Sequence, residues 1–353
     1  MIRTIKKESA GADGWKRTVF SLAVALLVTA FLIAMLGYNP FAVYGQMLKG
    51  SLGSSYQLKE TINKTIPLLV MSLGVCICLK GQFVNIGVEG QFFLGAIGAT
   101  FVVRKIGTAM GSGILPVMFL LAFVAGGLWC LLPALMKVKL KVNEIVVTLM
   151  LNYVALKIVS YLQYVVWKDP KAYGFPKIAN YPDVATLPKV FGIHCGWIIA
   201  IALVIAVYLL LDRSKFGYEL TAVGLNPNTA RYASINADKV VMLAAFIGGG
   251  LCGLAGLMQA SGIERTMNDQ MSQGLGFTAI VIAYMARLSP AGSVLVSLFF
   301  AIMLQGGSYI QSSLQIPSEI STVLEGIILL TILGSEFFTK YRIAIVGKGE
   351  GNA

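Results

Sequence analysis

Long apolar runs, separated by short polar links, follow one another along most of the chain. A helix that crosses a bilayer needs roughly 20 mostly apolar residues, because its backbone polar groups must be satisfied within the segment. The pattern therefore predicts an all-α polytopic membrane protein with about ten transmembrane helices. The predicted spans are 18–37, 65–79, 89–103, 113–136, 145–167, 197–211, 240–259, 274–286, 291–311 and 318–338.

One link carries polar residues within an otherwise apolar stretch. Residues 85–91 read Asn-Ile-Gly-Val-Glu-Gly-Gln. Gly81, Gly87 and Gly90 allow a bent backbone, and non-helical backbone at membrane depth is tolerated only where protein or a water-filled cavity surrounds it. We therefore predict a broken or re-entrant element near residues 80–91.

The polar side chains of this block are candidates for a solute pathway. In a regular helix Asn85 and Glu89 share a face at a spacing of four, whereas Gln91 points elsewhere. The three groups could line the pathway and hydrogen-bond a solute. They could equally bond neighbouring helices and hold the bend, and the residues alone leave both alternatives open.

Later spans contain further pathway candidates. Asn152 and Tyr153 lie in the fifth predicted span, Gln305 and Gln311 in the ninth, and Phe277 follows a glycine-rich entry to the eighth. Uncharged polar groups in spans commonly join helices, and aromatic rings commonly pack, so each residue has a structural alternative. The predicted pathway set is Asn85, Glu89, Gln91, Asn152, Phe277 and Gln305.

Composition supports the membrane assignment. Of 353 residues, 57% are hydrophobic and 12% are charged, and the mean hydropathy is +0.77. Apolar surface on this scale must largely face lipid rather than one water-excluded core. The scattered cysteines form neither a disulfide framework nor a metal-ligand spacing. These cysteines are Cys76, Cys78, Cys130, Cys195 and Cys252.

Membrane topology and anionic lipid headgroups explain the net charge of +12 better than nucleic-acid binding does. With the N-terminus in the cytoplasm, 17 Lys and Arg residues fall inside, 10 outside and Lys157 within a span. This bias agrees with the positive-inside rule. The prediction places the N-terminal segment 1–17 and the tail 339–353 in the cytoplasm, joined by a transmembrane domain over 18–338. The first apolar run resembles a retained helix rather than a cleaved signal.

Two polar connections are long enough to have structure of their own. Residues 168–196 are predicted to cap the outer face or touch a delivery protein. Residues 212–239 are predicted to lie inside and to contain a short helix, because Asn226 suits an N-cap and Pro227 suits the first helical position. We expect this helix to dock in a groove of a partner protein, and the alternative is that it is an ordinary solvated helix of a loop. The helix comprises Asn226, Pro227, Asn228, Thr229, Ala230, Arg231, Tyr232 and Ala233.

The sequence favours transport over catalysis. The only histidine, His194, lies in the outer connection, so no multi-histidine metal site can form within the membrane. Residues 347–349 lack the spacing of a phosphate-binding loop. An ion-coupled carrier would need intramembrane charges, which are costly in hydrocarbon. The candidates for that role are Glu89, Glu144, Lys157, Arg287 and Glu325.

Three blocks together resemble the permease subunit of bacterial ABC importers. They are residues 85–91, the Gly-Leu-Gly-Phe-Thr-Ala-Ile run at 274–280 and the loop at 222–236. The superfamily includes ribose, other simple-sugar and branched-chain amino-acid permeases, and the form of the first block is similar to the nucleoside-uptake branch. The resemblance covers about residues 61–338.

The resemblance implies several partners and no bound cofactor. These permeases carry no ATPase domain and pair two membrane subunits over a separate cytoplasmic ATPase, which uses ATP and Mg²⁺. A binding lipoprotein delivers the solute, here expected to be a nucleoside, or a simple sugar as the alternative. The helix at 226–233 matches the coupling helix that docks on the ATPase, although Glu219, Leu220 and Thr221 depart from the Glu-Ala-Ala loop of many other importers. An ion-coupled transporter and a structural scaffold are further alternatives.

Overall fold

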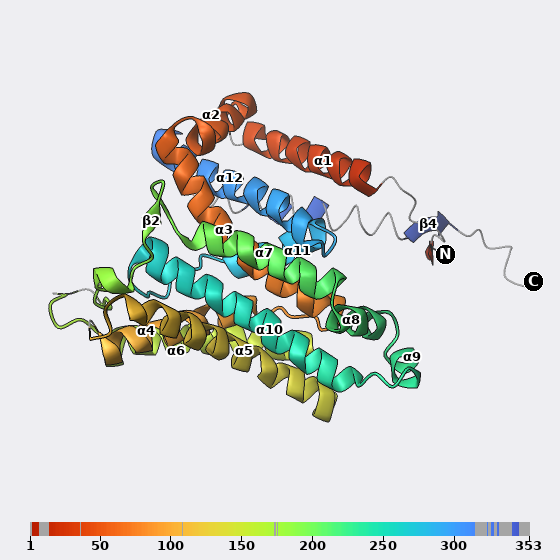
Figure 1. Cartoon of the computed structure of the whole chain (residues 1–353). Helices are drawn as coiled ribbons and strands as arrows, with labels where there is room; N and C mark the ends of the chain where they lie inside the picture. Colours follow the sequence, from red (N-terminus) through yellow and green to blue (C-terminus); the bar gives the residue numbers. More distant parts are fainter. Residues whose placement is uncertain are drawn as a thin grey trace, which may run out of the picture. The chain divides into compact units, whose positions relative to one another are not determined.

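The computed structural model describes residues 2–6, 14–35, 37–107, 109–172, 174, 176–314 and 341–345, and the single positions 323, 326, 327, 330 and 331. Apart from those single positions, the predicted span 318–338, with Glu325, lies outside the described residues. The chain forms two compact units, Leu58–Ala301 and a second unit made of Met1–Gln57 and Ile302–Ala353 (Figure 1).

The unit formed by the two chain ends contains two N-terminal helices. Asn39 caps the second of them by accepting hydrogen bonds from the backbone N–H groups of Phe41 and Ala42 at 3.0 and 3.4 Å. The elements of this unit are β1 (Ile2–Lys6), α1 (Gly14–Met35), α2 (Pro40–Leu52), the part of α12 (Pro290–Leu314) that follows Ala301, and β4 (Tyr341–Ile345), which pairs antiparallel with β1.

Helix α2 was absent from the sequence prediction, and the second predicted span began too late. The structure places a helix at Pro40–Leu52 and starts the next one at Ser55, not at residue 65. The reason is that these turns contain Lys49, Lys59 and Lys64, whose charges lower the local hydropathy without preventing a helix.

The larger unit is helical with short irregular turns (Figure 1). Its long elements are α3 (Ser55–Lys80), which belongs to the unit from Leu58, α4 (Val88–Ile106), α5 (Ile114–Leu140), α6 (Glu144–Tyr161), α7 (Gly196–Asp212), α8 (Lys215–Leu225), α9 (Pro227–Tyr232), α10 (Ala237–Met258), α11 (Leu275–Met285) and α12 up to Ala301. Its short elements are η1 (Gly111–Gly113), η2 (Leu162–Val166), η3 (Asp183–Ala185), η4 (Gln259–Glu264), β2 (Lys189–Val190) and β3 (Ile193–His194).

Helix α10 forms the centre of this unit because its glycines let other backbones approach closely. A Cβ atom added at Gly248 would lie 2.6 Å from the carbonyl oxygen of Gly74 on α3. A Cβ atom added at Gly126 on α5 would lie 2.8 Å from the Cα atom of Gly253. Small residues at helix crossings are typical of membrane proteins, where dispersion contacts rather than water exclusion hold helices together.

The helix lengths confirm the all-α polytopic architecture. Five described helices are long and apolar enough to cross a membrane, and the number becomes seven if each of two bent helix pairs is one span. Every predicted span except 318–338 coincides with a described helix. The total of about ten spans is therefore approximate, since α11 has only 11 residues and α4 carries charged residues at both ends.

The described residues of the connection 168–196 are hydrogen-bonded to the rest of their unit. Ser261 donates a hydrogen bond to the Ala185 carbonyl at 2.6 Å, and Thr266 donates one to the Ile178 carbonyl at 2.9 Å. The hydroxyls of Tyr181 and Thr100 are 2.6 Å apart. The first two bonds tie the connection to η4 and the residues that follow it, and the third ties it to α4.

Candidate functional site

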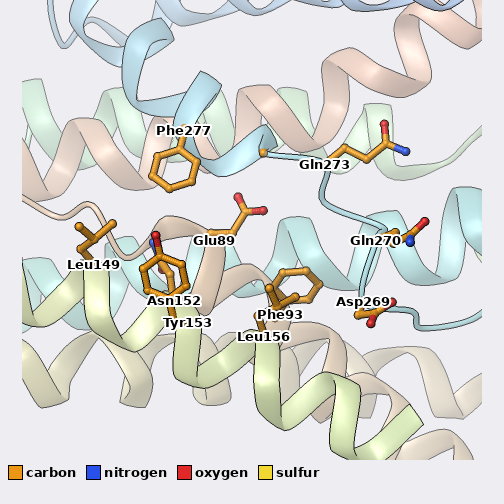
Figure 2. A pocket seen from close by; sticks show the side chains of 11 residues that line it. Glu89, Phe93, Leu149, Asn152, Tyr153, Leu156, Asp269, Gln270, Gln273 and Phe277 are labelled. Carbon is orange, nitrogen blue, oxygen red and sulfur yellow. The ribbon is translucent and has the colours of Figure 1, made fainter. Parts of the chain in front are cut away.

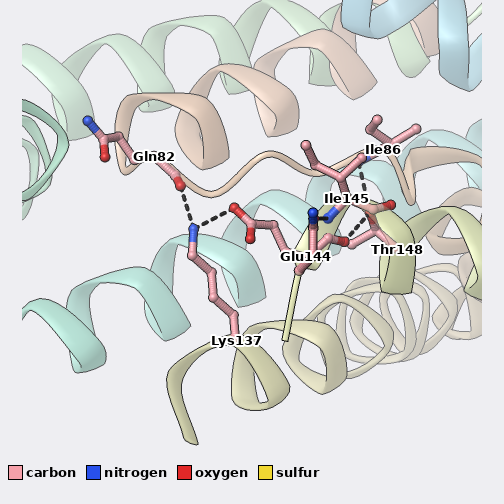
Figure 3. Close-up of polar contacts among 7 residues, drawn as sticks. Gln82, Ile86, Lys137, Glu144, Ile145 and Thr148 are labelled. Atoms are coloured by element: carbon pink, nitrogen blue, oxygen red, sulfur yellow. Dashed lines mark hydrogen bonds and ion pairs between the residues drawn. The ribbon is translucent and has the colours of Figure 1, made fainter. Parts of the chain in front are cut away.

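The predicted break near residues 80–91 is present as a non-helical segment, 81–87, between α3 and α4. Two side chains one turn apart on α6 satisfy its backbone. Thr148 accepts a hydrogen bond from the Ile86 N–H at 3.2 Å, and Asn152 donates one to the Ile86 carbonyl at 2.8 Å (Figure 3 shows Ile86 and Thr148). Asn152 also accepts from the Gly90 N–H at 2.8 Å. The break is thus tolerated because protein groups replace the missing helical bonds.

The start of the break is held by a charged pair (Figure 3). The Nζ atom of Lys137, near the end of α5, lies 2.6 Å from the Gln82 carbonyl oxygen and 2.6 Å from an oxygen of Glu144 on α6. The ammonium group also stands 5.6 Å from the ring centroid of Phe83. Lys137 therefore joins α5 and α6 to the non-helical segment.

Asn85 and Gln91 bind each other. Each side-chain amide donates to the other's oxygen at 2.9 Å, and the Asn85 oxygen also accepts from the Gly87 N–H at 2.9 Å. Both side chains are buried. This geometry favours the structural alternative for these two residues, because the bonds that a solute would need are made within the break.

Glu89 serves a different element. Its carboxylate accepts a hydrogen bond from the Gly276 N–H at 2.8 Å, in the first turn of α11. The first N–H groups of a helix have no partner within the helix and carry partial positive charge, so a carboxylate is well placed there. A Cβ atom at Gly276 would lie 2.7 Å from the Glu89 backbone nitrogen, which explains the glycine.

Glu89 also lines a pocket of about 420 Å³ between α4, α6 and the segment that leads into α11 (Figure 2). Tyr153 and Phe277 line the pocket and are 60% and 44% exposed. Asp269 is held to α6 by a 3.2 Å hydrogen bond from Ser160. The lining residues are Glu89, Phe93, Leu149, Asn152, Tyr153, Leu156, Asp269, Gln270, Gln273, Gly274 and Phe277.

The pocket brings together only some of the predicted pathway residues. Glu89, Asn152 and Phe277 line it, although three spans contribute them. Gln305 is half-buried on the part of α12 that belongs to the other unit. The sequence reasoning missed Asp269, Gln270 and Gln273, to which it assigned no role. The signal was a polar run immediately before the glycine-rich block at 274–280.

The predicted short helix of the inner connection is α9. The Asn226 side chain accepts from the N–H groups of Asn228 and Thr229 at 2.9 and 3.2 Å, which confirms the N-cap. Only Ala230 of this helix is buried, whereas Tyr232 exposes 92% of its surface. Figure 1 shows α9 at the edge of its unit, beyond the end of α8.

Helix α8 connects α9 to the break. The Gln82 side chain donates a hydrogen bond to the Gly224 carbonyl, and Lys80 forms a 3.3 Å ion pair with Asp212 at the end of α7. A Cβ atom at Gly224 would overlap the Lys80 carbonyl oxygen. The end of α8 is therefore in direct contact with the start of the non-helical segment 81–87, which leads to Glu89 on α4.

These features describe a polytopic membrane protein with a buried chain break, a mainly apolar pocket that contains two carboxylates, and an exposed short helix. The family model for the branched-chain amino acid transport system permease component matches residues 57–333. The chain belongs to this permease family, which confirms the resemblance carried by its three sequence blocks.

Relatives that match over most of their length are named for different solutes. The chain is 33% identical over 346 residues to a glucose ABC transporter permease protein of Haloferax volcanii, covering 95% of this chain and 91% of that one. It is 29% identical over 329 residues to a guanosine ABC transporter permease protein of Bacillus subtilis, covering 90% and 92%. It is 25% identical over 325 residues to a nucleoside ABC transporter permease protein of Lactococcus lactis subsp. cremoris, covering 89% of each. No solved structure gives a significant match.

Proposed function

We propose that this chain is the permease subunit of an ATP-driven importer of nucleosides. The observation that carries the proposal is the pocket, where the carboxylates of Glu89 and Asp269 lie near the exposed rings of Tyr153 and Phe277. Carboxylates accept hydrogen bonds from ribose hydroxyls and from base amino groups, and aromatic rings stack on base faces. No Lys or Arg is among the lining residues, so an anionic solute finds no opposite charge there.

The relatives support a solute of this class. Those of Bacillus subtilis and Lactococcus lactis are named for guanosine and for nucleosides. The Haloferax volcanii relative is named for glucose, and this makes a simple sugar the second candidate. The three solutes share hydroxyl groups that carboxylates and amides can bind.

Energy is supplied by a separate cytoplasmic ATPase that uses ATP and Mg²⁺, and this chain binds no cofactor. The ATPase docks on residues 226–233. An exposed aromatic side chain such as Tyr232 suits the central pocket of an interface, and a capped short helix presents it rigidly.

Motion of the docked helix reaches the pocket through contacts of the described residues. α9 follows α8 directly, and α8 contacts Lys80 and Gln82 through Gly224. The segment from Gln82 leads within seven residues to Glu89, which holds the start of α11. A shift of α9 is thereby transmitted to the wall of the pocket.

The proposal includes orientation and further partners. The chain lies in a bacterial cell membrane with both termini in the cytoplasm, and residues 168–196 face outward. A binding lipoprotein delivers solute to that face, and the exposed Phe191 between β2 and β3 offers a contact. A second permease subunit, identical or related, completes the membrane part.

The test is uptake of labelled nucleoside into vesicles that contain the complete complex. Uptake should require the ATPase and ATP, and excess unlabelled nucleoside should abolish it while excess glucose leaves it unchanged. If only glucose competed for uptake, the proposed substrate would be a sugar instead of a nucleoside. Uptake that continues without the ATPase and follows an ion gradient would instead support an ion-coupled carrier.

A further inference from the structure

We propose that the face of α6 that carries Tyr153, Lys157 and Tyr161 packs against a second permease subunit, so that the pocket at Glu89 opens between two subunits. This inference rests on the proposed function for the existence of that subunit. The three residues follow one another at a spacing of four and line one shallow groove on the surface of α6. Rows at this spacing form the ridges with which helices pack into each other's grooves.

Lys157 is the residue that lipid cannot accommodate. It is exposed, and its ammonium group makes no ion pair with any of the residues that the structure describes. The apolar helical segment around it runs over Glu144–Val166. At 1.5 Å per residue, Lys157 lies about 20 Å from the Glu144 end and about 14 Å from the Val166 end. This depth is well inside a hydrocarbon layer of roughly 30 Å.

The direction of the side chain makes escape to the nearer surface unfavourable. Cα–Cβ bonds of an α-helix lean toward its N-terminus, so Lys157 leans toward Glu144 and away from the closer, Val166 end. Snorkelling would therefore have to reverse the natural lean of the side chain. An unpaired charge at this depth is instead expected to meet protein or a water-filled cavity.

The neighbouring side chains also call for polar surroundings. Tyr153 and Tyr161 each expose 60% of their surface, and neither hydroxyl makes a hydrogen bond to the described part of the chain. The exposed face of α7 is different, because it carries Ile198, Ile201, Ile205 and Tyr208 but no charged side chain before Asp212 at the end of the helix. The contrast within one unit separates a face suited to lipid from a face suited to a protein partner.

Charge complementarity identifies the partner as another permease subunit. The α6 face carries one cation, and the adjoining pocket carries the carboxylate of Asp269. Asp269 is anchored to Ser160, which lies on the same helix as Lys157. A patch with both signs can pair with a copy or a relative of itself, because each cation can meet a carboxylate across a two-fold axis.

The test places a photo-crosslinking amino acid at Tyr161 in the complete, purified complex reconstituted in vesicles. Ile205 on α7 is the matched control, since it is similarly exposed on a face without a cation. Illumination should join two permease chains through position 161, as identified by mass spectrometry of the adduct, and position 205 should yield severalfold less. Adducts to lipid, to the ATPase, to the lipoprotein or to residues 318–338 of the same chain would each overturn the assignment.

Lys157→Met and Lys157→Arg provide the second readout. Loss of the cation should weaken permease pairing, measured as the fraction of permease dimer that survives in detergent, and Lys157→Arg should restore it. Equal pairing in all three proteins would contradict the proposal. Crosslinking and pairing require no transported solute. If the adduct forms but nucleoside uptake fails, only the proposal about the substrate is rejected. If nucleoside uptake is normal but no adduct forms, only the proposed α6 interface is rejected.

Discussion

The side-chain amides of Asn85 and Gln91 hydrogen-bond each other in both directions at 2.9 Å, inside the chain break between α3 and α4. This reciprocal bond closes a ring that uses the oxygen and one N–H of each amide within the break. The polar residues of this block therefore have two different roles. Asn85 and Gln91 hold the break, whereas Glu89, which lies between them in sequence, faces the pocket.

Truncation of either amide should therefore lower stability more than solute recognition. Asn85→Ala leaves the Gln91 amide buried without its partner, which costs about 1–3 kcal/mol. Gln91→Ala should cost a similar amount, and the double variant should cost less than the sum. The measurement is the thermal inactivation midpoint of the purified complex, together with the KM of uptake by the folded protein. A raised KM with unchanged stability would instead make these residues solute contacts.

The bond between Glu89 and Gly276 should control the position of α11. Glu89→Ala removes a carboxylate from a helix N-terminus, an interaction worth about 1.5–3 kcal/mol when the acceptor is charged. Glu89→Gln keeps an oxygen that can accept from Gly276 and should lose less. Uptake and thermal inactivation of both variants check this order. Equal loss in the two variants would show that the charge, rather than the hydrogen bond, matters.

Gly224→Ala should separate ATP hydrolysis from transport. The added methyl group would overlap the Lys80 carbonyl and push α8 away from the break. We expect ATP hydrolysis to persist while uptake falls at least about tenfold, which corresponds to roughly 1.4 kcal/mol. Gly45→Ala is the control, because nothing lies within 4 Å of a Cβ atom there. A parallel fall in hydrolysis and uptake would argue against transmission through this contact.

Tyr232→Ala should weaken association with the ATPase. Removing an aromatic side chain from the centre of an interface commonly costs about 2 kcal/mol or more. Phe191→Ala is a matched control, since that ring is 84% exposed but lies in the hairpin between β2 and β3. Co-purification of the ATPase at increasing detergent stringency would measure the difference. Equal retention by the two variants would place the docking surface elsewhere.

His194 should make stability depend on pH. Burial lowers the pKa of its imidazole from 6.5 to about 4, with a smaller contribution from Lys189, and neither ring nitrogen has a partner among the described residues. The unfolded chain therefore binds more protons between these values. Stability is fully present above pH 6.5 and decreases as pH falls toward 4, by roughly 3 kcal/mol in total.

The measurement for His194 is the thermal inactivation midpoint of the complex from pH 7.5 to pH 4. The His194→Phe variant fills the same buried position without a titratable group, so its midpoint should change less over this range. A pH profile identical to that of the natural chain would assign the dependence to other groups.

Local patterns predicted the features that depend on neighbours in sequence. The Asn226 cap and the start of α9 at Pro227 were visible because a cap acts over about three residues. The break near residues 80–91 was visible because polar groups and glycines interrupt an apolar run. Helix α2 was missed because its charged and glycine residues make the hydropathy signal weak in a helix of only 13 residues.

The partners of each polar side chain could not be predicted in this way. Asn152 was a candidate for the pathway, yet the structure shows that it also bonds the Ile86 carbonyl and the Gly90 N–H. Thr148 had no distinguishing signal, although it satisfies the other backbone group of Ile86. Such contacts join residues more than 60 positions apart, and no periodicity within one helix records them.

The amino-acid sequence alone established a polytopic helical membrane protein, its permease family and the capped helix of the inner connection. These conclusions follow from hydropathy, from short motifs and from capping, all of which act over a few turns of the chain. The three-dimensional packing assigned Asn85 and Gln91 to each other and Glu89 to α11, and it added Asp269 to the pocket. Those assignments depend on which helices meet, and close approach at glycines such as Gly248 sets that arrangement.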